Sequence, residues 1–169
     1  MISVAHADPH AFESAVRSVS SAVLGDLEVS ADLVMSFPTP LWGFPDYAEY
    51  ALVPAARDGL WWMQAMTNEA VTFLLADPFV LDAGYGVDLG ETERVALGIE
   101  QAPDAFSLVM LTLPNDSTDG ATANFKAPLV FNLARRAGMQ VVSRDETHDL
   151  RRAVSLDVFP PQADGVRVQ

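Results

Sequence analysis

The 169-residue sequence contains no cysteine, which excludes disulfides, thiolate zinc sites and a cysteine nucleophile. Its first residues lack the basic start and the apolar run of a secretory signal. No segment approaches the roughly 20 consecutive apolar residues that a transmembrane helix needs. We therefore expect a cytoplasmic protein that does not enter a membrane.

Positive charge is scarce as well. Ten Lys and Arg residues, of which Lys126 is the only lysine, stand against 23 Asp and Glu residues, and the net charge is -13. A field of this sign repels phosphate backbones and speeds encounter with a basic protein, although an acidic surface also serves solubility. Direct nucleic-acid binding is therefore disfavoured, while charge alone does not decide between a basic partner and plain solubility.

Motifs of catalysis and cofactor binding are missing too. The chain has no Gly-x-Ser-x-Gly elbow and no Walker-type Gly-Lys-Ser/Thr, and Gly84-Tyr85-Gly86 lacks the third glycine of a dinucleotide fingerprint. A hydrolase or isomerase built on paired carboxylates would need acids at suitable spacing, which the sequence does not offer. We predict no enzymatic activity and no cofactor.

Candidate metal ligands are few. His6 and His10 stand four residues apart, but Pro9 between them favours an exposed pair over a metal site. One loop is rich in carboxylates but lacks the spacing and central glycine of a calcium loop, which favours a solvated loop. Its acidic residues are Asp82, Asp88, Glu91 and Glu93.

The remaining pattern is that of one mainly β domain. Half of the residues are hydrophobic and the length suits a single domain. Short runs of β-branched, aromatic and aliphatic residues separated by Gly, Pro, Asn and Asp predict an antiparallel barrel or sandwich-like domain over residues 24–158. The predicted strands are 24–29, 32–37, 47–53, 60–66, 71–76, 106–113, 121–125, 129–134 and 139–143.

Helical signals occur at two places. Apolar residues at three- and four-residue spacing predict an amphipathic helical extension over residues 1–23, packed on the body of the protein. The stretch from Asp88 to Gly98 predicts one or two helical turns closed by the glycine. The segment 159–169, with Pro160-Pro161 and mostly polar residues after it, is expected to be a flexible tail.

Turn and strand-end signals complete the fold prediction. Arg57-Asp58-Gly59 and Arg136-Ala137-Gly138 predict hairpin turns in which the glycine takes a positive φ. Asp77-Pro78 predicts the end of a strand, because proline removes a ladder donor. Asn124 and Pro128 predict a break between two strands in the same way.

Four segments, taken together and in order, resemble the FliW family of flagellar assembly factors. The best is Thr122 to Asn132, TANFKAPLVFN, which follows the family pattern Thr-x-Asn-Leu-x-Ala-Pro-Ile-Val-Ile-Asn. The resemblance spans about residues 24–152. The other three segments are FPTPLWGF at 37–44, FLLADPF at 73–79 and GMQVV at 138–142.

The resemblance implies a function without catalysis. A protein of this family binds the RNA-binding regulator CsrA, relieves its repression of flagellin translation, and binds flagellin in a partner-switching loop. The first segment departs from the family pattern, with Pro40 in place of a glycine, Trp42 in place of a proline and Pro45 in place of a glutamate. The resemblance thus implies CsrA and flagellin as the partners of the protein. The departures in the first segment put the inherited specificity for these partners in question.

Six residues of the resembling segments are candidates for protein binding. Aromatic anchors dominate binding energy, so exposed rings in the first loop are the better candidates. For Asp77 and Asn124, a role in maintaining the fold is favoured over partner contact. The six are Trp42, Phe44, Tyr47, Asp77, Phe79 and Asn124.

A rival hypothesis is a β-barrel that binds a small ligand or carbohydrate. It would be favoured if Trp61 and Trp62 lined an open cavity. Because neighbours on a strand face opposite ways, we expect one of the two tryptophans to be buried and the other at least partly exposed.

Overall fold

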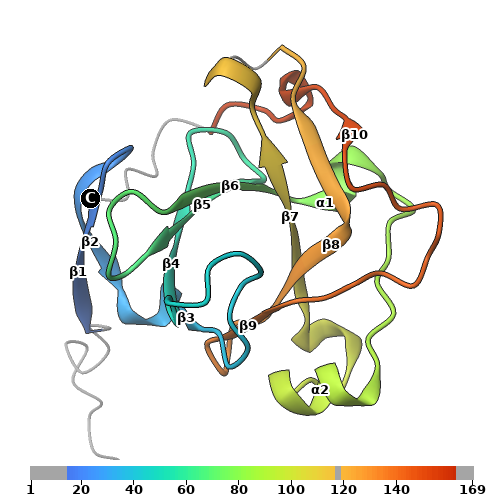
Figure 1. Ribbon diagram of the computed structural model, residues 1–169, viewed down its shortest axis with the longest axis horizontal. Coiled ribbons are helices and arrows are strands. Elements are labelled where there is room, and N and C mark those ends of the chain that lie inside the picture. Colours follow the sequence, from blue (N-terminus) through green and yellow to red (C-terminus); the bar gives the residue numbers. More distant parts are fainter. Residues whose placement is uncertain (1–14, 117–118, 163–169) are drawn as a thin grey trace, which may run out of the picture.

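Seven strands close into a barrel in the computed structural model, which describes residues 15–116 and 119–162 (Figure 1). Around the barrel the order is β8-β7-β6-β5-β4-β3-β9, and β9 pairs back to β8. All neighbours are antiparallel except β3 and β9. The prediction of a mainly β domain is confirmed. The strands are β3 (Val34–Ser36), β4 (Glu49–Pro54), β5 (Leu60–Ala65), β6 (Thr72–Ala76), β7 (Phe106–Thr112), β8 (Thr122–Asn132) and β9 (Ala137–Gln140).

The interior of the barrel is filled with side chains. Alternate residues of each strand point inward, as pairs such as Leu52–Met63, Leu75–Met110 and Leu108–Leu129 show. Tyr50 lies among them fully buried, and burial raises the pKa of its hydroxyl to about 12. The buried members of this core are Met35, Phe37, Leu41, Tyr50, Leu52, Met63, Ala65, Leu75, Leu108, Leu129 and Phe131.

Three elements cover the outer face of the barrel, because its strands are apolar on both sides. The hairpin of β1 (Val16–Ser21) and β2 (Gly25–Ser30) packs Val19 and Val29 on the outside of β4. Helix α2 (Glu91–Leu97) packs Leu97 against β8 and β9. The C-terminal segment, with β10 (Arg152–Ala153) and the buried Phe159, covers the third part together with helix α1 (Pro78–Leu81).

The prediction of a helix over residues 1–23 is wrong where the structure describes it. Residues Val16–Ser21 form β1, which pairs along its whole length with β2. The branched valine side chain fits a strand better than a helix. Every residue of β1 also has a partner in β2. The ion pair of Arg17 with Glu49, at 2.7 Å, also ties the hairpin to β4. The rest of the predicted helix, residues 1–14, lies outside the described residues.

The predicted short helix is confirmed as α2, and Gly98 ends it in the left-handed conformation at φ 66°. In the described ranges, 15–116 and 119–162, no helix is long and apolar enough to cross a membrane. The described residues also contain 3-10 turns at Ala31–Leu33, Ala102–Asp104, Pro114–Asp116 and Leu156–Val158.

The predicted break between residues 125 and 129 is a bend within one continuous strand, β8. From the pair Met110–Asn124 to the pair Leu108–Leu129, β8 advances five residues while β7 advances two. The three extra residues of β8 are an odd number. Side chains that point outward before the bend therefore alternate with the opposite phase after it, and residues of the same parity point inward. Ala123 and Phe125 therefore belong to an apolar cluster on the outside of the barrel, the outer core, which also contains Tyr85 and Phe159. Leu129 and Phe131, which are also odd-numbered, face the interior instead.

The two predicted hairpin turns differ in their glycines. Gly59 takes a positive φ of 87°, as expected. In the second turn Arg136 is left-handed instead, at φ 51°, while Gly138 sits within β9. Gly138 is needed for space, because a Cβ there would lie 2.8 Å from the Phe131 ring and 2.9 Å from that of Phe37.

The expectations for the tail and the tryptophans also need correction. The predicted flexible tail begins too early, because Phe159 is fully buried and Gln162 donates its N–H to the carbonyl of Ala56. Residues 163–169 lie outside the described residues. Trp61 and Trp62 face opposite ways, but neither is fully buried: Trp61 packs on the barrel core and Trp62 on the outer core.

We expect Gly138→Ala to lower the free energy of unfolding by about 1–3 kcal/mol, because the added methyl group meets two aromatic rings that cannot move apart freely. Gly86→Ala is the matched control, since a Cβ there meets nothing within 4 Å. Urea unfolding of both variants checks this. An equal effect of the two substitutions would contradict the packing role of Gly138.

Candidate protein-binding surface

The loop of residues 37–48, between β3 and β4, is fastened onto the barrel. Leu41 is buried in the barrel core, and Phe44 donates its N–H to the Leu41 carbonyl. The ring of Phe44 meets Phe73 edge-on at 4.9 Å. Tyr47 accepts a 2.7 Å hydrogen bond from the side-chain amide of Asn68. These contacts give the loop a fixed position on the end of the barrel.

Trp42 is the ring that this loop presents to solvent. Its side chain is 54% exposed, whereas Phe44 and Tyr47 are partly buried against the core. The expectation that all three rings are exposed is therefore wrong for Phe44 and Tyr47. Nothing in the sequence indicated that these two rings pack against the core. In a loop rich in Pro and Gly, the same sequence pattern is compatible with a buried and with an exposed aromatic ring.

One neighbour of Trp42, Gln140, was not among the predicted residues. Gln140 accepts the Trp42 backbone N–H at 3.4 Å and donates to the carbonyl of Ala127. The contact between Trp42 and Gln140 joins residues 98 positions apart, so no local pattern predicts it.

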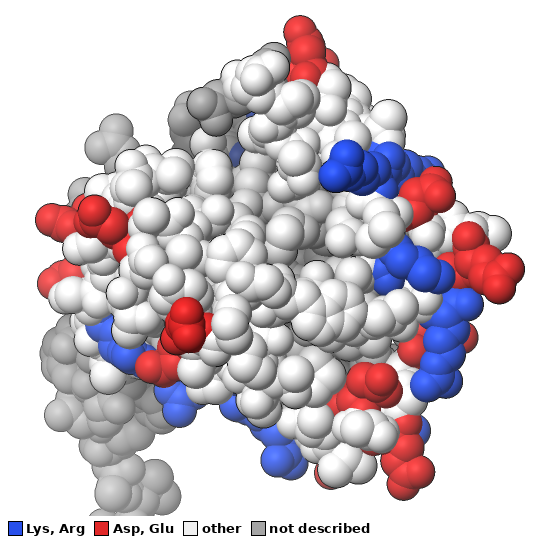
Figure 2. Space-filling view, in the orientation of Figure 1, with Lys and Arg blue, Asp and Glu red and all other residues white. Residues whose placement is uncertain are grey.

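Charged side chains lie mainly toward the edges of the face that presents this loop (Figure 2). The loop carries one charged residue, Asp46, and none from Pro38 to Pro45. An exposed ring in a segment with little charge is typical of a protein-binding surface, whose centre is depleted in charge and enriched in aromatic residues. The loop is thus the best-supported binding surface among the predicted residues.

Asp77 and Phe79 lie on a different part of the barrel, at the start of α1. Asp77 caps this helix, accepting the N–H of Phe79 at 2.9 Å, and Pro78 occupies its first turn. The expected strand end at Asp77-Pro78 is thereby explained. Phe79 is 52% exposed and touches Tyr85 edge-on.

Asn124 serves the bend of β8. Its side-chain oxygen accepts the N–H of Ala127 at 2.9 Å, inside the stretch where β8 leaves the register of β7. The amides of Phe125 and Lys126 both donate to the carbonyl of Asp149. Asn124 therefore has a structural part, as the sequence interpretation favoured.

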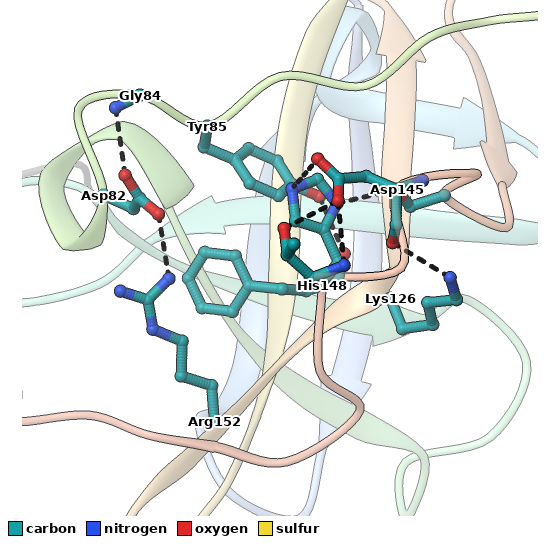
Figure 3. A network of polar contacts seen from close by, with 10 residues as sticks. Asp82, Gly84, Tyr85, Lys126, Asp145, His148 and Arg152 are labelled. Atoms are coloured by element: carbon teal, nitrogen blue, oxygen red, sulfur yellow. Dashed lines mark hydrogen bonds and ion pairs between the residues drawn. The ribbon is translucent and has the colours of Figure 1, made fainter.

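A polar network fastens the C-terminal segment beside this bend (Figure 3). His148 Nδ1 lies 2.6 Å from the Ser143 hydroxyl and Nε2 lies 3.6 Å from the Asp145 carboxylate. The composition matches a serine hydrolase triad, but Ser143 is only 2% exposed and accepts the Asp145 N–H, so its oxygen is closed to a substrate. The group is therefore structural, and it holds the C-terminal segment beside the bend of β8.

Tyr85 and Arg152 connect this polar network to the outer core. The Tyr85 ring lies 4.7 Å from that of His148, and its hydroxyl donates to the Phe125 carbonyl. Arg152 lies over the Phe125 ring and forms a 2.9 Å ion pair with Asp82. The hydrogen bond from Arg152, followed by the N–H of Gly84, lowers the pKa of Asp82.

The predicted acidic loop is thus partly used in structure, through Asp82. In the part of the chain that the structure describes, no group of three or more His, Asp or Glu side chains is placed to hold a metal ion.

The family model described as FliW protein matches residues 18–154. The chain belongs to the FliW family. The match begins within β1, so most of the first hairpin lies inside the FliW domain and not in an added extension.

Curated relatives of this FliW chain carry the name flagellar assembly factor FliW. The protein of Symbiobacterium thermophilum is 35% identical over 122 residues, which cover 71% of this chain and 88% of that protein. The protein of Leptospira biflexa serovar Patoc is 27% identical over 138 residues, 81% of this chain and 90% of that protein. A crystal structure of the flagellar assembly factor FliW superposes with a TM-score of 0.73 at 25% identity, covering 85% of this chain and 98% of that one.

We expect Asp82→Asn to destabilise this FliW chain at neutral pH and much less in acid. The pKa of Asp82 is lowered in the folded state, so its stabilisation is present above the ordinary aspartate pKa of about 3.9 and is lost as the pH falls through the lowered value. Urea unfolding at pH 7 and at pH 3 measures the difference from the wild type.

The control for this comparison is Asp58→Asn, on an exposed turn, since Asp58 forms no ion pair with a described residue. If Asp82→Asn cost the same free energy at both pH values, the ion pair with Arg152 would not be its cause.

Proposed function

We propose that this chain binds the RNA-binding regulator CsrA, antagonises its repression of flagellin mRNA, and binds flagellin in a partner-switching loop. Membership of a family of flagellar assembly factors supports this proposal. The observation that carries it is the exposed Trp42 on a loop whose other large side chains are anchored in the barrel core. The function is proposed for the cytoplasm, where flagellin mRNA is translated.

A fixed loop favours binding because little conformational freedom is lost when a partner docks. Leu41, Phe44 and Tyr47 hold the loop before any partner arrives. The tryptophan can then bury a large apolar area, while its indole N–H remains available as a donor.

The net charge of -13 also suits a basic regulator as one partner. Opposite charge accelerates encounter and makes the association rate depend on salt. We do not assign the carboxylates to imitation of RNA phosphates. The acidic surface acts in this account on encounter and specificity.

The proposal excludes catalysis as the activity of the chain. The group with triad composition has a buried serine that a substrate does not reach. The rival, a ligand-binding barrel, loses its support because Trp61 packs on Phe106 in the filled interior and Trp62 packs on the outer core.

Isothermal titration calorimetry against CsrA and flagellin of the same genome tests the proposal. We expect saturable binding of each partner to the folded chain. Silence with both partners, each shown to be folded, would sink the assignment of partners while leaving the family membership intact.

For the surface itself, we expect Trp42→Ala to weaken the affinity for at least one of the two partners by roughly 30-fold, the cost of about 2 kcal/mol that truncation of an aromatic anchor incurs. The stability of the chain should change little, because Trp42 is mostly exposed. The same titrations measure the affinity, and thermal unfolding measures the stability.

Val95→Ala is the control for an exposed apolar residue elsewhere, on the outer side of α2. It should leave both affinities within about twofold, as a surface change away from an interface does. Unchanged affinities in Trp42→Ala would remove loop 37–48 from the interface.

A further inference from the structure

A second surface lies where β7 begins, away from loop 37–48. A groove of about 570 Å³ is lined there by residues of α1, of the chain that leads into α2, and of the first part of β7. Its apolar lining residues include Phe79, Val87, Leu89 and Ile99. The exposed half of the Phe79 ring thus borders a concave surface.

The floor of this groove includes an open strand edge. Phe106 and Ser107 of β7 pair with Phe131 and Val130 of β8 on one side. On the other side β6 reaches only Val109 and Met110, because it ends at Ala76 and the chain turns into α1. Within residues 15–116 and 119–162, no strand pairs with Phe106 or Ser107 on that side.

An unpaired edge of this kind is a template for an added strand. Phe106 and Ser107 are both partly exposed and both line the groove. The early end of β6 is itself caused by Asp77 and Pro78, the strand stop noted in the sequence.

The charges around the groove select the chemistry of an occupant. Its charged lining residues are Asp77, Asp88, Glu100 and Arg94, three acids against one base. Asp77 is occupied as a helix cap. The carboxylates of Asp88 and Glu100 form no ion pair with a described residue, so they are free to receive cations.

We propose that this groove binds an extended segment of a partner protein, which adds to β7 as a strand at Phe106 and Ser107. Alternate side chains of such a segment point the same way, so an apolar residue packs against Phe79 and a Lys or Arg reaches toward Asp88 or Glu100. The inference stands apart from loop 37–48 and does not depend on the identity of the partners proposed above.

Selection of random twelve-residue peptides displayed on phage tests this inference. The wild-type chain is the bait, and the Asp88→Lys/Glu100→Lys variant removes peptides that bind elsewhere. We expect the enriched peptides to alternate apolar residues with Lys or Arg. A selected peptide, synthesised and titrated by fluorescence anisotropy, should bind the double variant at least tenfold more weakly, and Phe79→Ala at least fivefold more weakly.

Two controls separate strand pairing from simple charge attraction. Glu28→Lys/Glu69→Lys carries the same change in net charge on the exposed part of the first hairpin and the β5–β6 turn, and should keep the wild-type affinity within twofold. N-methylation of the peptide at alternate backbone positions should abolish binding in one register and leave it in the other, because only one set of N–H groups faces β7.

Four outcomes would overturn the proposal. The first is a failure to enrich any peptide, and the second is equal loss of affinity in the control double variant. The third is apolar residues at three- and four-residue spacing with no effect of N-methylation, which would indicate a helix. The fourth is self-association of the wild-type chain that the Asp88→Lys/Glu100→Lys variant abolishes, measured by sedimentation equilibrium, which would assign the groove to a second copy.

Discussion

The hydrogen bond from the Ala127 N–H to the Asn124 side chain holds the bend in β8 on which closure of the barrel depends. The first half of β8 pairs with β7 and β10, and the second half pairs with β7 and β9. Because the bend exchanges the faces of the strand, one run of alternating residues fills the outer core with Phe125 and then the interior with Leu129 and Phe131. A straight strand would direct one of these sets into the wrong place.

The segment 141–153 is folded around this bend. The amides of Phe125 and Lys126 reach the carbonyl of Asp149, and the carbonyls of Lys126 and Pro128 accept from Ser143 and Val141. Buried backbone groups need partners, so this segment supplies what β7 cannot supply at the bend. The contacts of His148 with Ser143 and Tyr85 keep it there. The family motif TANFKAPLVFN is thus mainly a structural device.

Local patterns predicted most of the barrel, because alternation, Gly59 and the Gly98 cap act within a few residues. They failed where the answer depends on distant contacts. The spacing of Val16, Val19 and Val23 fits a helix, yet pairing with residues 25–30 makes a strand. Among the three aromatic candidates in loop 37–48, Phe44 and Tyr47 are held against the barrel by Phe73 and Asn68. These distant contacts distinguish them from the exposed Trp42. The groove beside β7 was missed because it is lined from segments up to 30 positions apart.

The six residues predicted to bind partners thus fall into two groups. Four of them stabilise the fold: Asn124, Asp77, Phe44 and Tyr47. The other two, Trp42 and Phe79, are exposed on the surface. The central claim is that the chain exchanges one protein partner for another. Size-exclusion chromatography with light scattering, on a preformed complex with CsrA to which flagellin is added, tests it most directly. The account predicts that the CsrA complex disappears and that free CsrA and a flagellin complex replace it. A stable assembly that contains all three proteins would contradict it.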